Sequence, residues 1–191
     1  MIAIIILAAG NSSRLGQPKQ FLEYNGKSLL KNSVNQALAI NEATVIVVSG
    51  AENESIERAL QDTKAILCHN SDWQSGMSSS IKTGLKKALE LYPKITACII
   101  SVCDQPFITE HIFMELLLKY KSTDKIITSY YSETTGPPVL FPKQHFSKLL
   151  DLTGNEGAKK ILNSGEDVIA VNFAKGEIDI DTIEEYQKLP T

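Results

Sequence analysis

Runs of apolar residues that end at a glycine or a polar residue recur along the chain. The first run, Ile2–Ala9, contains eight residues and stops at Gly10. Eight residues are too few to cross a bilayer, which takes about 20 in a helix, and no cationic stretch precedes them as in a signal peptide. The run therefore predicts a strand that is buried on both faces of a parallel sheet. Similar runs predict further strands over residues 44–50, 64–69 and 97–104.

Between these strands, apolar residues recur at the three- and four-residue spacing of amphipathic helices. The predicted helices cover residues 28–40, 54–61, 77–92 and 109–120. The chain continues with predicted strands over 125–131, 139–141 and 167–173, and short helical segments at 157–162 and 182–189 flank the last of them. This alternation predicts a single three-layer α/β/α, Rossmann-like domain with a mostly parallel sheet, spanning residues 1–191.

Composition narrows the classes of function. The 191 residues carry a net charge of −3, which argues against a nucleic-acid partner, because such proteins present a basic face. The three cysteines form no C-x-x-C pair, so neither a disulfide framework nor a zinc site is expected. We therefore expect a protein of the reducing cytoplasm that has neither nucleic acid nor a membrane as its partner.

The loop after the first strand combines glycines with cations. Ligands of parallel α/β sheets bind outside the carboxyl ends of the strands, and Gly10 and Gly16 let backbone amides approach such a ligand closely. Arg14 and Lys19 add positive charge, so the loop is typical of a phosphate cradle. The spacing fits neither G-x-x-x-x-G-K-[ST] nor G-x-G-x-x-G. The alternative is a solvated turn with two surface cations.

Several segments together resemble one known family. LAAGNSSRLGQPKQFL (residues 7–22) resembles the signature LAAG-x-S-x-R-x-G-x-x-K of nucleotidyltransferases that activate sugars, isoprenoid precursors and the molybdenum cofactor. Four later segments narrow the resemblance to MobA-like enzymes, and most closely to molybdenum cofactor cytidylyltransferases: residues 71–85, 103–109, 136–162 and 179–189. Two residues depart from that pattern, because Asn155 stands where the family usually has Asp and Lys159 where Arg is common.

The resemblance implies a fold of the nucleotide-diphospho-sugar transferase type and a set of site residues. Arg14, Lys19 and Asp104 are the expected catalytic residues, and the first two would hold the triphosphate. The expected nucleotide-binding residues are Leu7, Ala8, Ala9, Gly10, Arg14, Lys19, Gly76 and Ser80. For Gly76 and Ser80 the alternative is an ordinary helix start with capping serines.

Carboxylates at strand and helix ends are candidates for the metal. Asp104 follows a buried strand at the sheet edge where ligands bind, and hard carboxylate oxygens suit Mg²⁺ or Mn²⁺. Asp181 is the expected second ligand, and Asp179 lies on the same face of an extended chain. Asp104 could instead cap a turn, and Asp181 could instead be a helix N-cap that forms a capping box with Glu184.

The expected reaction is the transfer of CMP from CTP to the phosphate of the molybdopterin cofactor, with release of pyrophosphate. The methyl group of Ala9 would crowd a purine, which favours CTP. Expected partners are an NTP, the molybdopterin cofactor or a similar phosphorylated acceptor, and a molybdoenzyme or its chaperone. The alternatives are a guanylyltransferase, a cytidylyltransferase for another phosphorylated small molecule, and a non-catalytic protein that delivers the molybdenum cofactor.

Overall fold

A seven-stranded sheet forms the centre of the computed structural model, which describes residues 1–12, 15–163 and 167–190. The strand order is β5-β4-β1-β6-β8-β7-β9. Only β8 runs antiparallel to its neighbours. The bounds are β1 Ile2–Ala8, β4 Ala43–Ser49, β5 Ile66–His69, β6 Ala97–Val102, β7 Ile126–Tyr131, β8 Thr134–Pro142 and β9 Val168–Asn172.

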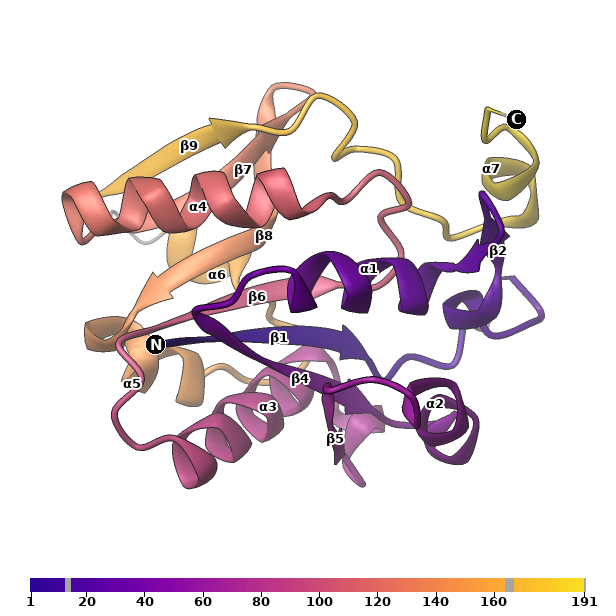
Figure 1. Cartoon of the computed structure of the whole chain (residues 1–191), viewed down its shortest axis with the longest axis horizontal. Helices are drawn as coiled ribbons and strands as arrows, with labels where there is room; N and C mark the ends of the chain where they lie inside the picture. Colours follow the sequence, from indigo (N-terminus) through magenta and orange to yellow (C-terminus); the bar gives the residue numbers. More distant parts are fainter. Residues whose placement is uncertain (13–14, 164–166, 191) are drawn as a thin grey trace.

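Helices cover both faces of this sheet (Figure 1). One face packs against α1 (Leu29–Leu38), α2 (Asn53–Leu60) and α4 (Glu110–Thr123). The opposite face packs against α3 (Met77–Leu91), α5 (Phe146–Leu150) and α6 (Lys159–Leu162). The expected three-layer α/β/α fold with a mostly parallel sheet is therefore confirmed. A last helix, α7 (Ile183–Gln187), lies apart from these layers, near the hairpin of β2 (Glu23–Tyr24) and β3 (Lys27–Ser28).

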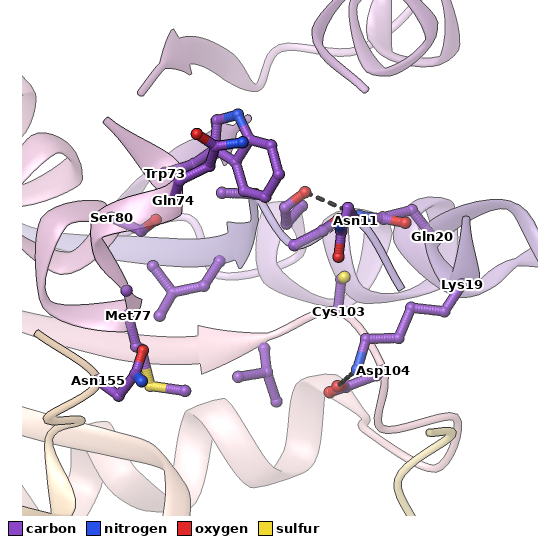
Figure 2. Close-up of a pocket in the computed structure, with 16 residues that line it drawn as sticks. Asn11, Lys19, Gln20, Trp73, Gln74, Met77, Ser80, Cys103, Asp104 and Asn155 are labelled. Carbon is purple, nitrogen blue, oxygen red and sulfur yellow. Dashed lines mark hydrogen bonds and ion pairs between the residues drawn. The ribbon is translucent and has the colours of Figure 1, made fainter. Parts of the chain in front are cut away.

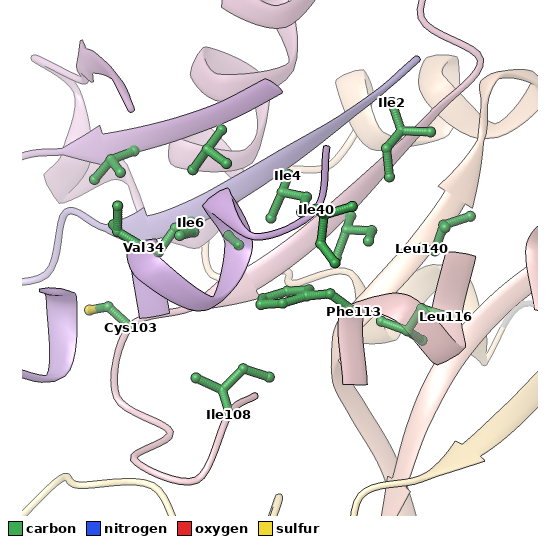
Figure 3. Close-up of a cluster of buried hydrophobic side chains, with 14 of the residues drawn as sticks. Ile2, Ile4, Ile6, Val34, Ile40, Cys103, Ile108, Phe113, Leu116 and Leu140 are labelled. Carbon is green, nitrogen blue, oxygen red and sulfur yellow. The ribbon is translucent and has the colours of Figure 1, made fainter. Parts of the chain in front are cut away.

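The alternation of side chains along β1 builds both halves of the core. Ile2, Ile4 and Ile6 point toward α1 and α4, where they pack around the buried ring of Phe113 (Figure 3). Ala3, Ile5 and Leu7 face the opposite layer. Because successive side chains of a strand point to opposite faces, an uninterrupted apolar run is what a strand between two helix layers requires.

The structure differs from the expectations mainly in the second half of the chain. β8 spans nine residues rather than the three expected, and it is the antiparallel strand. The hairpin of β2 and β3 was not expected. β6 ends at Val102, so Asp104 lies in the loop that follows the strand rather than within it.

Two observations concern the expectations about membranes and disulfides. In the described part of the chain, no helix has the length and apolar character needed to cross a bilayer. Cys68, Cys98 and Cys103 are free thiols.

Candidate active site

A cavity of about 490 Å³ opens at the carboxyl ends of β1 and β6. The end of β1 and the loop after it, Leu7–Asn11, form one wall, and Val102–Asp104 form another. The start of α3 and the 3₁₀ turn before it, η2 (Trp73–Ser75), form a third. Asn155 closes the cavity from the loop before α6. The site therefore lies where ligands of parallel α/β sheets bind.

Gln20 holds the loop after β1 in its shape. Its side-chain amide donates hydrogen bonds to the carbonyl oxygens of Ala8 (2.9 Å) and Gly10 (2.7 Å), on either side of Ala9. The hydroxyl of Ser12 accepts a hydrogen bond from the backbone N–H of Lys19 at 2.9 Å. Gln20 is itself buried. Gln20 therefore fixes the start of the loop, where Ala8, Ala9 and Gly10 line the cavity.

Lys19 lies between two carboxylates that come from distant parts of the chain. Its ammonium Nζ is 2.5 Å from Oδ2 of Asp104 and 2.9 Å from Oδ1 of Asp181. Burial alone would lower the pKa of Lys19, but the charge of Asp104 and hydrogen bonds to both carboxylates outweigh it and raise that pKa above its usual value. Lys19 is therefore a cation throughout the neutral pH range.

The segment after β9 reaches this cluster through backbone and apolar contacts. The N–H of Ile180 donates to the carbonyl oxygen of Asp104 at 3.1 Å. The side chain of Ile180 is buried with Leu15, Leu22 and Leu29 in a small third core. These contacts bring Asp181 next to Lys19. Asp179 belongs to the same cluster. Burial raises the pKa of its carboxyl, and the negative charges of Asp104 and Asp181 raise it further.

Among the described residues, no charged side chain lines the opposite end of the cavity. Trp73, Gln74 and Ser80 line it, while Lys19 and Asp104 lie at the other end (Figure 2). Trp73 packs against the backbone of Gly50 at the end of β4, where a Cβ atom would lie only 2.8 Å from two Trp73 side-chain carbons. Beneath this wall, buried Asn70 donates hydrogen bonds to the hydroxyls of Ser79 and Ser80.

The start of α3 is joined to the loop that precedes α6. The carbonyl oxygen of Gly154 accepts hydrogen bonds from the backbone N–H of Ser78 (3.2 Å) and from its hydroxyl (2.7 Å). Gly76 has a φ of +99°, and a Cβ there would lie 2.5 Å from Oδ1 of Asn155. Glycine is required at this position both for the backbone conformation and for the close approach.

Comparison with known proteins identifies the family. Residues 4–168 match the model of the MobA-like NTP transferase domain. The chain belongs to this family. As a MobA-like NTP transferase, it is a nucleotidyltransferase, and the expected resemblance is confirmed.

Individual relatives are similar over almost their whole length. The MobA-like chain is 32% identical to the purine catabolism protein PucB of Bacillus subtilis, over 95% of this chain and 92% of PucB. It is 27% identical to the molybdenum cofactor cytidylyltransferase of Escherichia coli, over 97% and 93%. Rv0371c of Mycobacterium tuberculosis superposes with a TM-score of 0.83 at 25% identity, covering 98% of this chain and 97% of that one.

The site brings together most of the residues singled out in the sequence of this MobA-like protein. The cavity is lined by Leu7, Ala8, Ala9, Gly10, Lys19, Gly76, Ser80 and Asp104. Asp181 is outside the lining but is bonded to Lys19. Arg14 lies outside the described residues. The alternative capping box at Asp181 is wrong, because Thr182 is the N-cap of α7 and pairs with Glu185 rather than Glu184.

No local sequence pattern indicates some of the other residues of the site. Asn70 and Gln20 act through hydrogen bonds to residues 10 to 12 positions away, which no local pattern indicates. Met77 borders the cavity from the exposed start of α3, although methionine at helical spacing is more often a core residue. Asn155 stands out in the sequence as a departure from the family pattern, and in the structure it faces the cavity next to Met77.

Proposed function

We propose that this MobA-like protein transfers CMP from CTP to the phosphate of the molybdopterin cofactor and releases pyrophosphate. The observation that supports it best is the convergence of Lys19, Asp104 and Asp181 at one end of a cavity whose other end is uncharged. A nucleoside triphosphate also has a charged end, its phosphates, and an uncharged end, its base. Because two carboxylates face the single cation of Lys19, a divalent metal would be needed to hold the anionic phosphates there. In this proposal the phosphates lie at the charged end.

The carboxylates of Asp104 and Asp181 are suited to a divalent metal. Oδ1 of Asp104 is buried and has no hydrogen-bond partner among the described residues, so it has lone pairs to offer. One oxygen of each carboxylate already faces a cation, since Lys19 bonds to Oδ2 of Asp104 and to Oδ1 of Asp181. Mg²⁺ or Mn²⁺ at these oxygens would neutralise the triphosphate and polarise the α-phosphate.

The chain's own residues would supply positioning and positive charge. Lys19 would turn from the carboxylates toward the triphosphate and stabilise the charge that develops on the leaving pyrophosphate. Arg14 is proposed to act beside it. The backbone of Leu7, Ala8, Ala9 and Gly10 would contact the nucleotide, in the conformation that Gln20 holds. These groups align an oxygen of the acceptor phosphate with the α-phosphorus, and alignment supplies a large part of the acceleration.

The choice of CTP and of the acceptor is supported by smaller features. Ala9 lines the cavity, and its methyl group leaves less room than glycine for a purine. Similarity to the cytidylyltransferase of Escherichia coli covers nearly the whole chain. Asn155 borders the cavity away from the loop after β1, and its neighbour Gly154 is bonded to Ser78, so the acceptor is proposed to enter along this segment.

Pyrophosphate release tests this proposal directly. The protein is incubated with Mg²⁺, purified molybdenum cofactor and CTP, GTP, ATP or UTP in turn. We expect release with CTP, and a loss of at least about 100-fold in Asp104→Asn. Asp62→Asn, a matched change at an exposed carboxylate, should leave the rate unchanged.

The other outcomes separate the alternative functions. Release with GTP would identify a guanylyltransferase and overturn the argument from Ala9. Release only with another phosphorylated acceptor would keep the chemistry and change the substrate. Binding of nucleotide without any release would favour a protein that delivers the cofactor to a molybdoenzyme.

A further inference from the structure

The uncharged end of the cavity is the place for the nucleobase if the phosphates lie at the charged end. Trp73, Gln74 and Ser80 form this end, away from Lys19 and Asp104 (Figure 2). Of these side chains, Ser80 is almost completely buried, with 5% of its surface exposed. Its hydroxyl is therefore a fixed polar group in the wall that a base would meet. This inference rests on the proposed nucleotide-binding function.

The orientation of the Asn70 side chain is determined by a backbone donor. Asn70 is buried, and its Oδ1 accepts a hydrogen bond from the N–H of Asp72 at 3.0 Å. A backbone N–H can only donate, so the oxygen of the amide must face it. The amide nitrogen then faces α3, where it donates to the hydroxyls of Ser79 (2.8 Å) and Ser80 (3.0 Å).

Ser79 and Ser80 differ in whether the hydroxyl proton is free to bond to a ligand. The hydroxyl of Ser79 donates its proton within the protein, to the carbonyl oxygens of Asp72 and Gly76. The hydroxyl of Ser80 accepts from Asn70, and its proton has no acceptor among the described residues. The Ser80 oxygen keeps a second lone pair, but its proton has no acceptor among the described residues, so the proton is the group that gains most by facing the cavity.

We propose that Asn70 is a positioning residue that fixes Ser80 as a hydrogen-bond donor to the nucleobase. Cytosine and uracil both present the acceptor O2, so the proposed donor distinguishes the two bases by meeting the ring nitrogen N3. The ring nitrogen N3 of cytosine is unprotonated and accepts a hydrogen bond, whereas N3 of uracil carries a proton. Asn70 thus contributes to the selection of CTP over UTP, although it touches neither nucleotide.

An isosteric change at Asn70 should reverse the polarity of Ser80. In Asn70→Asp, the carboxylate still accepts from the N–H of Asp72, but it can no longer donate to Ser80. The Ser80 proton turns toward the carboxylate, and its lone pairs face the cavity, where they suit the N3–H of uracil. We expect the ratio of CTP affinity to UTP affinity to fall by about tenfold or more. If Asn70 had only a structural role, Asn70→Asp would weaken the binding of CTP and of UTP by the same factor.

The experiment measures binding of CTP and UTP by calorimetry, with Mg²⁺ present and without acceptor. Ser80→Ala should bring the ratio close to one, and Ser80→Thr, which keeps the hydroxyl, should restore it. Ser79→Ala is the matched control, because it removes the neighbouring hydroxyl and leaves the bond between Asn70 and Ser80. The serine variants keep the test decisive if Asn70→Asp does not fold.

Two results would overturn the inference. If Ser80→Ala keeps the wild-type ratio while pyrophosphate release is intact, Ser80 does not select the base, and the proposed function stands. If the wild-type protein binds neither CTP nor UTP, the proposed function fails together with this inference.

Discussion

At the scale of single residues, Lys19 has two competing sets of partners. In the structure its ammonium bonds to Asp104 and Asp181, whereas catalysis would require it at the triphosphate. In the proposed function, the same two carboxylates would hold a divalent metal. An ion pair of partly buried groups also leaves an uncompensated charge when one member is removed. If the proposed function holds, Lys19 neutralises the carboxylates in the free protein and would leave them when metal and nucleotide bind.

Lys19→Met should separate these two roles. Without the ammonium, the free protein should bind Mn²⁺ about tenfold more tightly or better, because the metal no longer competes with a cation for the carboxylates. Pyrophosphate release should fall at least about 100-fold, because the triphosphate loses its positive partner. Mn²⁺ affinity is measured by electron paramagnetic resonance of the free ion, without nucleotide.

The control is Lys175→Met, which removes the same charge from a nearby lysine. The ammonium of Lys175 lies 4.5 Å above the ring of Phe107 rather than on either carboxylate. Its effect on Mn²⁺ affinity should be small and should weaken with salt, as a long-range charge effect does. A Lys19→Met protein that binds Mn²⁺ no better than wild type would contradict the competition.

At the scale of elements, α3 connects the site to the sheet. Its first residues border the cavity, and its middle lies close against β1 and β4 at Gly84. A Cβ at Gly84 would overlap the side chain of Ile5 and lie 2.8 Å from a methyl carbon of Val48. Both are fully buried in the core, so neither can move aside at low cost.

Gly84→Ala should therefore destabilise the protein by about 1–3 kcal/mol, as overpacked cores do. Alanine also has a higher helix propensity than glycine, by about 1 kcal/mol, which offsets part of this cost. The measured change in the free energy of unfolding is therefore the overpacking cost minus the propensity gain. Urea unfolding followed by circular dichroism measures it. Thr83→Ala, at the preceding and only half-buried position, should change stability by no more than a few tenths of a kcal/mol. A stabilised Gly84→Ala would mean that α3 can shift away from the sheet.

The elements also show what local sequence could and could not predict. β1, β4, β6 and most helices were predicted to within a few residues, because each has a strong apolar period and a clear stop. β8 was predicted as three residues because Pro137 and Pro138 interrupt its pattern. In the structure they fall where the pairing of β7 and β8 shifts register, since Thr128 pairs with Val139 and the next residue pairs with Gly136. The direction of β8 depends on non-local pairing, which no local pattern records.

For the site, local motifs predicted the groups that face the cavity but not those that hold them. Lys19 and Asp104 stand in recognisable segments, and they meet at the carboxyl ends of neighbouring strands. Gln20 and Asn70 have buried amide side chains, and the groups to which they donate hydrogen bonds are brought close only by folding. An amide has no characteristic spacing from its partners, so its role is visible only in three dimensions.

At the scale of the whole molecule, one sheet joins both ends of the chain. β1 lies near the centre of the strand order and β9 at its edge, with β6, β8 and β7 between them. The two large cores lie on opposite faces of this same sheet, and both draw on nearly all its strands. No strand can leave without exposing apolar surface on both faces, so unfolding of one part should carry the rest with it.

Unfolding by urea should therefore be a single transition, as expected for one domain over residues 1–191. Three probes report on different places. Far-ultraviolet circular dichroism follows the helices, and fluorescence of Trp73, the only tryptophan, follows the site. Thiol labelling of Cys98 follows the centre of the sheet, where burial raises the pKa of this thiol and keeps it unreactive at pH 8. We expect the three midpoints to coincide within error. An earlier change in Trp73 fluorescence alone would mean that the site opens while the sheet stays folded, and an earlier loss of helical signal would contradict a single domain.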